Sequence, residues 1–312
     1  MGIVVIGTAF VDIKGFPEDA YIPTGRNVGR VEYIHGGVAR NVVEDIANAE
    51  LRPTYLGIVD DTPMGASVLQ KLRNHKVNCD YCLTIPDGMG TWLAVFDNNG
   101  DVAGSISKRP NFYPMLNQLE QRGDEIFAAA DSIVLQVDVH KDIAKKAIEL
   151  AKKHGKKIFA LVSNMSIAAE RRDFLQKFDC FICNQLEAGL LFLDDYEGKT
   201  PEEMRAILLD KVIAAKIPSM VVTMGGDGAV YANMEGQSGV VPARNVAVKD
   251  TTGAGDAFCA GVAIGLTYGK DLAGAVEIGT MLAASVIVSS ENVCPRFQPR
   301  ELGLEIQPEV EK

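Results

Sequence analysis

Late in the chain the sequence runs Lys249-Asp-Thr-Thr-Gly-Ala-Gly-Asp-Ala-Phe258, a short glycine turn followed at once by residues typical of a helix. The free backbone N–H groups at the start of a helix, together with the positive end of the helix dipole, form a site for anions. Glycine lets the backbone approach such an anion with no side chain in the way. The stretch therefore indicates an anion site, and a phosphate would suit it.

Asp256 falls in the first turn of this expected helix. A carboxylate repels a phosphate, so its position makes sense if it acts there, for instance by taking a proton from an attacking hydroxyl. The alternative is that Asp256 only satisfies the helix N-terminus, which Asp does often. Local physics leaves both interpretations open.

The composition is ordinary for a globular protein of 312 residues, which can form one large α/β domain or two smaller ones. The formal net charge of −10 argues against a nucleic-acid partner, because that binding needs clustered Lys and Arg. No apolar run approaches the ~20 residues of a membrane span, so we expect no membrane association. The N-terminal Met1-Gly-Ile-Val-Val-Ile-Gly7 is typical of a buried strand and lacks the basic region of a signal peptide, which favours a cytoplasmic location.

Two cysteine pairs, Cys79/Cys82 and Cys180/Cys183, have the spacing of a zinc site. Both lie in short runs typical of β-strands. Positions i and i+3 of a strand face opposite sides, so neither pair could chelate one ion. We therefore expect buried reduced thiols, with a zinc or redox role as the lesser alternative.

From residue 132 onward, strand-like and helix-like segments alternate. The expected strands are 132–137, 157–162, 178–183 and 219–223, and the expected helices are 141–153 and 201–215. This alternation predicts a mainly parallel sheet with helices on both faces. Such sheets bind ligands beyond the carboxyl ends of their strands.

The N-terminal half begins with an expected strand over 3–6 and a half-exposed strand over 30–34. Gly36-Gly37 then precedes an amphipathic helix predicted from Val38 to about Ala49, with Asn41 beside its apolar stripe. Residues 91–107 predict a hairpin around an Asn-Asn-Gly turn. These segments do not fit the later alternation, and we expect them to form a small separate sheet that could act as a lid.

Three further features carry alternatives. The run Val221–Val230 predicts two strands around a glycine turn, which can pass close to phosphates but is also common for steric reasons. Asn184 and Glu187 follow a strand, where they could hold a hydrated Mg²⁺ or, as we favour on local grounds, cap a helix. Asp12 lies just past the first strand, and it could bind two sugar hydroxyls or serve a turn.

The motifs Gly36-Gly37-Val-Ala-Arg-Asn41, Asn184-x-x-Glu187 and Asp250-Thr-Thr-Gly-Ala-Gly-Asp256 occur in the order seen in the ribokinase-like (PfkB-type) carbohydrate and nucleoside kinases. The chain resembles this family to about Pro299, and the last motif is highly specific. The resemblance implies one kinase domain over residues 1–312, an α/β fold with a three-layer α/β/α arrangement, a mainly parallel central sheet and a small β-sheet lid. The lid segments are expected at about 8–36 and 84–111.

The resemblance also implies transfer of the γ-phosphate of ATP to a hydroxyl of a small sugar or nucleoside, with Mg²⁺. It implies that Asp256 is the general base and that the N–H groups of Gly253, Ala254 and Gly255 form an anion hole. Substrate contacts are implied for Asp12, Lys14, Gly36, Gly37 and Asn41. ATP contacts are implied for Asn184, Thr223, Gly225, Gly226, Gly228, Gly253 and Gly255. Asn184 and Glu187 are implied to organise Mg²⁺ mostly through water, and Asp250 and Thr252 to belong to a monovalent-cation (K⁺) site.

Within the family, residues 36–41, 12–15 and 289–292 look most like pseudouridine kinases, which implies a 5′-hydroxyl as acceptor. Two segments depart from the family pattern: Ile106-Ser-Lys-Arg-Pro-Asn111 at the lid exit, and Leu161-Val-Ser-Asn164, where many members carry Asp after the strand. Both help to shape the acceptor pocket. Ribose, fructose, adenosine and 2-keto-3-deoxygluconate therefore stay open as acceptors.

Rival classes fit less well. A dinucleotide-dependent dehydrogenase needs Gly-x-Gly-x-x-Gly after an early strand, and Gly7-Thr-Ala-Phe-Val-Asp12 lacks it. A catalytically silent sugar- or nucleotide-binding relative has no need of Asp256 beside a phosphate. The half-exposed strands near Val31 and Leu93 also predict a possible homodimer through the lid, because an exposed apolar sheet face needs covering.

Overall fold

The computed structural model describes residues 2–305. Within them an eight-stranded central sheet has the strand order β14-β13-β12-β11-β10-β9-β1-β4. Its strands are β1 (Ile3–Ile6), β4 (Thr54–Leu56), β9 (Ser132–Gln136), β10 (Ile158–Leu161), β11 (Cys180–Asn184), β12 (Ser219–Thr223), β13 (Ala229–Asn233) and β14 (Ser238–Val241). The six from β4 to β12 are parallel, and β13 and β14 add an antiparallel edge.

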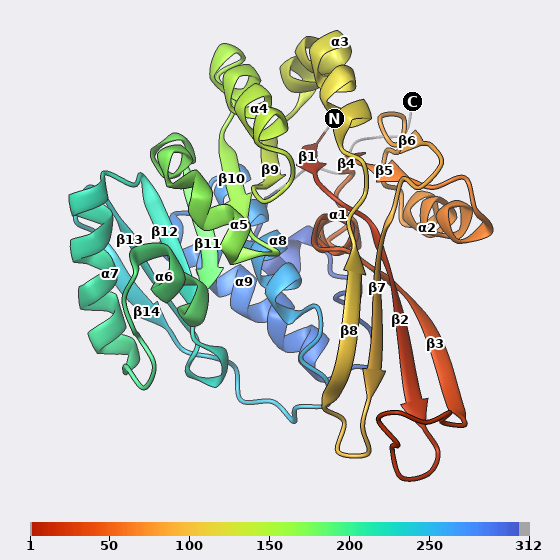
Figure 1. The fold of residues 1–312 in the computed structure, drawn as a ribbon. Coiled ribbons are helices and arrows are strands. Elements are labelled where there is room, and N and C mark those ends of the chain that lie inside the picture. Colours follow the sequence, from red (N-terminus) through yellow and green to blue (C-terminus); the bar gives the residue numbers. More distant parts are fainter. Residues whose placement is uncertain (1, 306–312) are drawn as a thin grey trace.

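Helices cover both faces of this sheet (Figure 1). One face packs against α1 (Val38–Asn48), α2 (Pro63–Asn74), α8 (Ala254–Thr267) and α9 (Leu272–Ile287). The other packs against α3 (Tyr113–Ala129), α4 (Lys141–Lys153), α5 (Met165–Ala168), α6 (Gln185–Phe192) and α7 (Pro201–Ala215), with a 3₁₀ helix over Ala169–Lys177. Shorter 3₁₀ turns span Gly225–Asp227 and Pro299–Leu302.

The strand β1 shows why both faces need helices. Its four residues are fully buried, Ile3 and Val5 in the hydrophobic cluster under α1 and α8, Val4 and Ile6 in the cluster under α3 and α4. A parallel sheet buried on both faces has such continuous apolar strands. The expected α/β fold with three α/β/α layers is confirmed.

A second sheet, of four strands among the described residues, projects from the central body (Figure 1). Its order is β3-β2-β7-β8, built from β2 (Phe10–Pro17), β3 (Gly29–Gly36), β7 (Gly90–Phe96) and β8 (Val102–Lys108). A short pair, β5 (Ile58–Val59) and β6 (Leu83–Thr84), lies apart from it. The predicted hairpin is β7–β8, and the predicted strand over 30–34 is the longer β3.

Register across the small sheet separates its two faces. Asp12 pairs with Trp92, and Trp92 with Ser107, so these three lie in one row. The next row is Ile13, Leu93 and Ile106. Side chains alternate along a strand, so the two rows point to opposite faces.

The strand argument for the cysteines holds for one pair only. Cys180 and Cys183 lie on β11 and enter opposite hydrophobic clusters, as expected. The prediction of a strand was wrong for Cys79 and Cys82, which lie in a turn where Cys82 N–H donates to the Cys79 carbonyl at 3.0 Å. The alternation of a strand therefore cannot separate that pair. Burial raises the pKa of the Cys79 thiol to about 11, which disfavours the thiolate.

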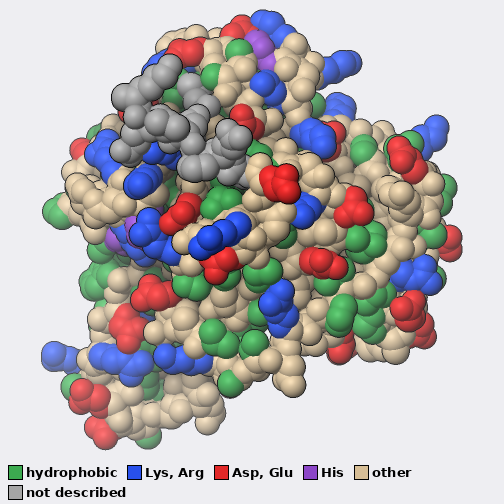
Figure 2. Space-filling view, turned by 180° about the vertical axis from the view of Figure 1, so that it is seen from behind, with side chains coloured by type: hydrophobic (Ala, Val, Ile, Leu, Met, Phe, Trp, Pro, Cys, Tyr) green, Lys and Arg blue, Asp and Glu red, His purple; other side chains and the backbone are tan. Residues whose placement is uncertain are grey.

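The described surface mixes charges of both signs. On the face shown in Figure 2, Lys, Arg, Asp and Glu side chains are interspersed, with hydrophobic side chains between them. Among residues 2–305, no helix combines the length and the apolar character needed to cross a membrane.

Candidate active site

A cavity of about 430 Å³ is lined both by the small sheet and by residues beyond the carboxyl ends of central strands. Its size is within the range of small-molecule sites, roughly 300–1,000 Å³. Its lining residues are Thr8, Phe10, Asp12, Gly37, Val38, Asn41, Trp92, Ser107, Arg109, Phe112, Gln136, Asp138, Ser163, Asn164, Thr252, Gly253, Asp256 and Asn292.

The first turn of α8 opens into this cavity. Gly253 precedes the helix with a φ of 82°, and no side chain caps the first-turn N–H groups. A Cβ on Gly253 would collide with the backbone carbonyl of Asn292, so only glycine fits there. The N–H groups of this 14-residue helix meet no capping side chain and face the position where the sequence predicts an anion site.

Asp256 is joined to α1 at this point. Asn41 Nδ2 lies 2.6 Å from Asp256 Oδ2 and donates a hydrogen bond to it. Asn292 Nδ2 donates to the His35 carbonyl at 2.9 Å and lies 3.4 Å from Asn41 Oδ1, which holds the amide of Asn41 in place. Burial raises the pKa of Asp256 to about 6, although the Asn41 hydrogen bond and the nearby charge of Arg40 act in the opposite direction.

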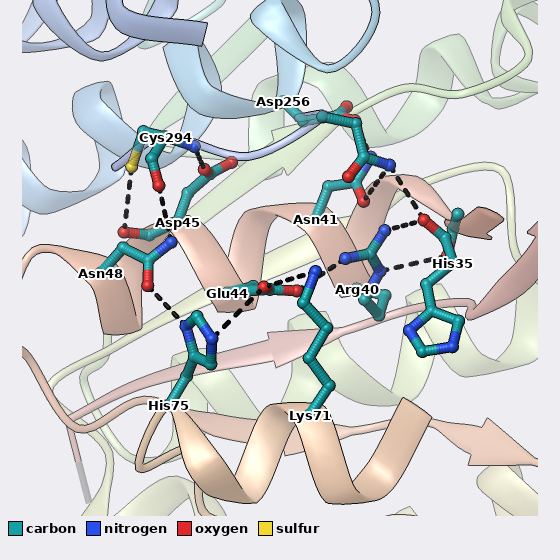
Figure 3. Close-up of polar contacts among 12 residues, drawn as sticks. His35, Arg40, Asn41, Glu44, Asp45, Asn48, Lys71, His75, Asp256 and Cys294 are labelled. Atoms are coloured by element: carbon teal, nitrogen blue, oxygen red, sulfur yellow. Dashed lines mark hydrogen bonds and ion pairs between the residues drawn. The ribbon is translucent and has the colours of Figure 1, made fainter. Parts of the chain in front are cut away.

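A buried network on α1 supports this arrangement (Figure 3). Arg40 is 1% exposed; it forms an ion pair with Glu44 at 2.6 Å and donates to the backbone carbonyls of His35 and Gly36. Lys71 of α2 lies 3.0 Å from the other oxygen of Glu44. Burial raises the pKa of Glu44, but its ion pairs with Arg40 and Lys71 outweigh burial and hold this pKa below its ordinary value.

The network continues along α1 away from the cavity (Figure 3). His75 Nδ1 lies 2.6 Å from Asn48 Oδ1, and Asn48 Nδ2 donates to the Cys294 carbonyl at 2.7 Å. Cys294 N–H donates to Asp45 at 2.6 Å. Burial raises the pKa of Asp45 well above its ordinary value, which favours a neutral carboxyl in this fully buried position.

Asp12 lines the cavity from β2. Burial raises its pKa, while Lys14 and Arg40 lower it. Gly37, with a φ of 97°, lines the cavity where a Cβ would come within 2.6 Å of the Thr8 carbonyl. Lys14 lies on the face of β2 that carries Asp12, two residues further out, and is not among the residues that line the cavity.

Gly36 is likewise absent from the lining residues, but a Cβ there would lie 2.6 Å from Asp12 Oδ2. Its lack of a side chain therefore leaves room for the Asp12 carboxylate.

Four polar residues of the cavity wall, Thr8, Gln136, Asp138 and Ser163, form a second cluster. Thr8 N–H and Oγ1 each lie 2.9 Å from Gln136 Oε1, and Gln136 Nε2 donates to Ser163 Oγ at 2.9 Å. Ser163 donates from N–H and Oγ to the carboxylate of Asp138, at 2.9 and 2.6 Å. Asp138 and Gln136 were not singled out from the sequence, although both lie at the carboxyl end of a predicted strand.

The expected ATP-contacting residues gather at neighbouring strand ends. Asn184 ends β11 directly opposite Thr223, which ends β12, and the 3₁₀ turn Gly225–Asp227 follows with Gly228 at a φ of 99°. Asn184 and Glu187 form the capping box of α6: Glu187 N–H donates to Asn184 Oδ1, and Asn184 N–H to Glu187 Oε2, both at 2.8 Å. The capping interpretation is therefore confirmed.

The capping box leaves one carboxylate oxygen of Glu187 for other use, and burial raises the pKa of this residue. Oxygen ligands of this kind suit Mg²⁺, which keeps several waters. At the start of the α8 motif, Thr252 N–H donates to Asp250 Oδ1 at 2.9 Å, and this bond lowers the pKa of Asp250.

Comparisons with known proteins agree with this geometry. A model of the pfkB family carbohydrate kinases matches residues 2–296. A guanosine-inosine kinase of Exiguobacterium acetylicum is 34% identical over 293 residues, 93% of this chain and 95% of the relative. A pseudouridine kinase of Escherichia coli (strain K12) is 25% identical over 264 residues, 84% of this chain and 82% of the relative.

Among solved structures, Arabidopsis thaliana ribokinase complexed with ribose and ATP has a TM-score of 0.81 at 18% identity, and the match covers 98% of this chain and 99% of that one. At this identity the likeness shows the fold. Fold, site and family model together define a sugar or nucleoside kinase. The chain belongs to the pfkB family of carbohydrate kinases, whose reaction uses ATP with a divalent metal.

Proposed function

We propose that this kinase transfers the γ-phosphate of ATP to the 5′-hydroxyl of a nucleoside, with purine nucleosides as the favoured acceptors. The observation that carries the chemistry is the position of Asp256. Its carboxylate lies in the first turn of α8, in a cavity shared with Asp12, and its pKa is raised to about 6. A general base works best when its pKa lies near the working pH.

In this proposal the acceptor hydroxyl lies against Asp256, which takes its proton as the oxygen attacks the γ-phosphoryl group. The bond from that group to the oxygen bridging it to the β-phosphate breaks, and ADP leaves. The first-turn N–H groups at Gly253, Ala254 and Gly255 stabilise the negative charge on that group. Asn41 orients the carboxylate through the 2.6 Å hydrogen bond. Asp12 accepts hydrogen bonds from sugar hydroxyls, and Gly37, which has no side chain, leaves room for the sugar beside it.

The nucleotide is proposed to lie along the strand ends that carry Asn184 and Thr223, with the turn of Gly225, Gly226 and Gly228 against it. Asn184 and Glu187 would hold Mg²⁺ mostly through water, and the ion would supply charge neutralisation at the phosphates. Asp250 and Thr252 are proposed for K⁺. Substrate contacts of Lys14 and Gly36 stay predictions.

Two observations support a purine nucleoside as acceptor. The relative named guanosine-inosine kinase is 34% identical over nearly the whole chain. Three aromatic residues line the cavity, Phe10, Trp92 and Phe112, and such rings can stack on a base. Pseudouridine, predicted from the sequence, is the second candidate, because a pseudouridine kinase also matches, at 25% identity.

Three wider features belong to the same proposal. Residues 1–312 act as one kinase domain in which segments 8–36 and 84–111 form a lid over the acceptor. The enzyme works in the cytoplasm. Two copies associate through the outer face of the lid, where Tyr33 and Ile106 are 60% and 71% exposed.

A coupled ADP-release assay tests the function. The panel contains inosine, guanosine, adenosine, pseudouridine, uridine, ribose, fructose and 2-keto-3-deoxygluconate. We expect the highest kcat/KM for inosine or guanosine. A preference for ribose or fructose would refute the assignment of a nucleoside as the acceptor. A preference for pseudouridine would refute the purine nucleoside and favour pseudouridine, the second candidate.

The variant Asp256→Asn tests the base in the same assay. Loss of the proton acceptor should lower kcat by about 10²- to 10⁴-fold while ATP binding, followed by calorimetry, persists. Turnover near the wild-type rate would refute the role of Asp256 and would revive a purely structural one.

A further inference from the structure

Segments 106–111 and 161–164, in which the sequence departs from the family pattern, meet in the wall of the cavity. Arg109 lies at the lid exit, one residue beyond the end of β8, and Ser163 follows β10. Both contact Asp138: Ser163 through the carboxylate, and Arg109 Nη2 through the backbone carbonyl at 2.6 Å. All three line the cavity that contains Asp256.

Asp138 is a rigid anchor for this arginine. It is 1% exposed, and two hydrogen bonds from Ser163 hold its carboxylate. Arg109 Nη2 lies 3.9 Å from Asp138 Oδ2, so the carboxylate gives a long ionic contact while the carbonyl gives the hydrogen bond. The guanidinium is thereby held by one edge.

Most donors of Arg109 are left for a ligand. A guanidinium has five N–H donors. Among the side chains and backbone groups that the structure describes, Arg109 donates a hydrogen bond to the Asp138 carbonyl alone, and the Arg109 side chain is 43% exposed. Its charge also lies 5.5 Å from the ring centroid of Phe112, another residue of the cavity wall.

A chain of contacts links Asp256 to Arg109. Asp256 bonds to Asn41 of α1, and the neighbouring Arg40 N–H donates to the Thr8 carbonyl at 3.3 Å. Thr8 bonds to Gln136, which lies 3.4 Å from the Asp138 carboxylate. Arg109 and Asp256 are the two end members of this chain of contacts, and both line the cavity. A nucleoside whose 5′-hydroxyl reaches Asp256 would place its base toward Arg109.

We propose that Arg109 donates two hydrogen bonds to the O6/N7 edge of a 6-oxopurine, and so selects guanosine and inosine over adenosine. The inference rests on the proposed nucleoside kinase function. An arginine fork matches two adjacent acceptors, as in arginine recognition of O6 and N7 of guanine. Adenine presents an amino donor in place of O6, so the same fork meets a second donor there.

The test compares inosine, 7-deazainosine and adenosine as acceptors for the wild type and the variants Arg109→Met and Arg109→Lys. The wild type should lose about 10- to 100-fold in kcat/KM when N7 or O6 is replaced. Arg109→Met should lose a similar factor with inosine and should no longer distinguish inosine from 7-deazainosine. Arg109→Lys should recover part of the preference, because one donor can still reach one acceptor.

Lys108→Met is the matched control. Lys108 is the neighbouring cation; it pairs with Asp87 at 2.6 Å on an exposed surface and is not among the residues that line the cavity. Its removal should leave the inosine/adenosine ratio of kcat/KM unchanged. Near-identical melting temperatures for the variants would show that the changes are local.

The outcomes separate the inference from the function on which it rests. If inosine is phosphorylated and Arg109→Met lowers kcat/KM by the same factor for every acceptor, Arg109 only holds the lid segment in place. If Arg109→Met instead raises KM for ATP, Arg109 binds phosphate. In both cases the inference fails while the proposed function stands. If the wild type phosphorylates no purine nucleoside, the proposed acceptor fails and the inference fails with it. Sensitivity to 7-deaza replacement that persists in Arg109→Met would also overturn it.

Discussion

Asn41 Nδ2 lies 2.6 Å from Asp256 Oδ2, and this one hydrogen bond joins helices whose residues are 215 positions apart in sequence. It fixes the Asp256 carboxylate between the first turn of α1 and the first turn of α8. The charged form of Asp256 gains from the bond, since a donor to a carboxylate lowers its pKa. The amide therefore both orients and tunes the proposed base.

The pH dependence of kcat/KM should report this pairing. The pKa of Asp256 is raised to about 6 by burial, so the active, deprotonated form is lost as the pH falls through that value. Asn41→Ala removes a donor that lowers this pKa, and its acid limb should move to higher pH. Profiles measured from pH 5 to 8.5 check the shift. An acid limb at the same pH in both proteins would show that Asn41 does not tune Asp256.

Asp12→Ala should act on the acceptor and spare the nucleotide. Asp12 lines the cavity proposed for the acceptor, whereas Asn184 and Thr223 are not among its lining residues. A hydrogen bond to a charged group contributes about 1.5–3 kcal/mol, so loss of the Asp12 carboxylate should raise KM for the nucleoside about 10-fold or more. Steady-state kinetics with each substrate varied in turn measure both KM values. Equal increases for nucleoside and ATP would indicate a structural Asp12.

The sequence predicted much of this site because its motifs are local. The glycine turn before α8 requires a positive φ at Gly253, and the alternation after residue 132 predicts the parallel sheet. Each of these depends on neighbours in the chain. The same local reasoning gave both the Mg²⁺ and the capping interpretations of Glu187, and the structure shows that its carboxylate takes part in the cap.

What the sequence missed depends on distant packing. Arg40 was read only as a member of a motif, yet α1 buries it with Glu44, and the pairing partner Lys71 comes from α2. The i, i+4 spacing of Arg40 and Glu44 is a signal for an ion pair but not for its burial. The cluster of Asp138 and Ser163 likewise forms only when β9 and β10 lie side by side.

Removing one partner of the buried Arg40–Glu44 pair should lower the free energy of unfolding more than removing both. Arg40→Met leaves Glu44 fully buried without its 2.6 Å partner, and such single breaks cost about 3–5 kcal/mol. The double variant Arg40→Met/Glu44→Leu should be more stable than the single one, because no charge is stranded, although Lys71 then loses its partner. Urea unfolding gives the free energy of unfolding of each protein. A double variant that loses the sum of both single effects would contradict coupling.

Association through the lid should depend on its outer row. Tyr33, Leu93 and Ile106 occupy facing positions on neighbouring strands around Ile13, and all three are at least 42% exposed. An apolar row of this kind is usually covered in a partner interface.

A charge at Ile106 should therefore break the association. We expect the wild type to be a dimer at micromolar concentration by light scattering, and Ile106→Glu to be a monomer, because a buried carboxylate would need a partner. Ile213→Glu is the matched control, since Ile213 is also exposed, at 47%, but lies on α7. A monomeric wild type, or monomers from both variants, would count against the lid as the interface. If the dimer also completes the acceptor site, Ile106→Glu should raise KM for the nucleoside more than KM for ATP.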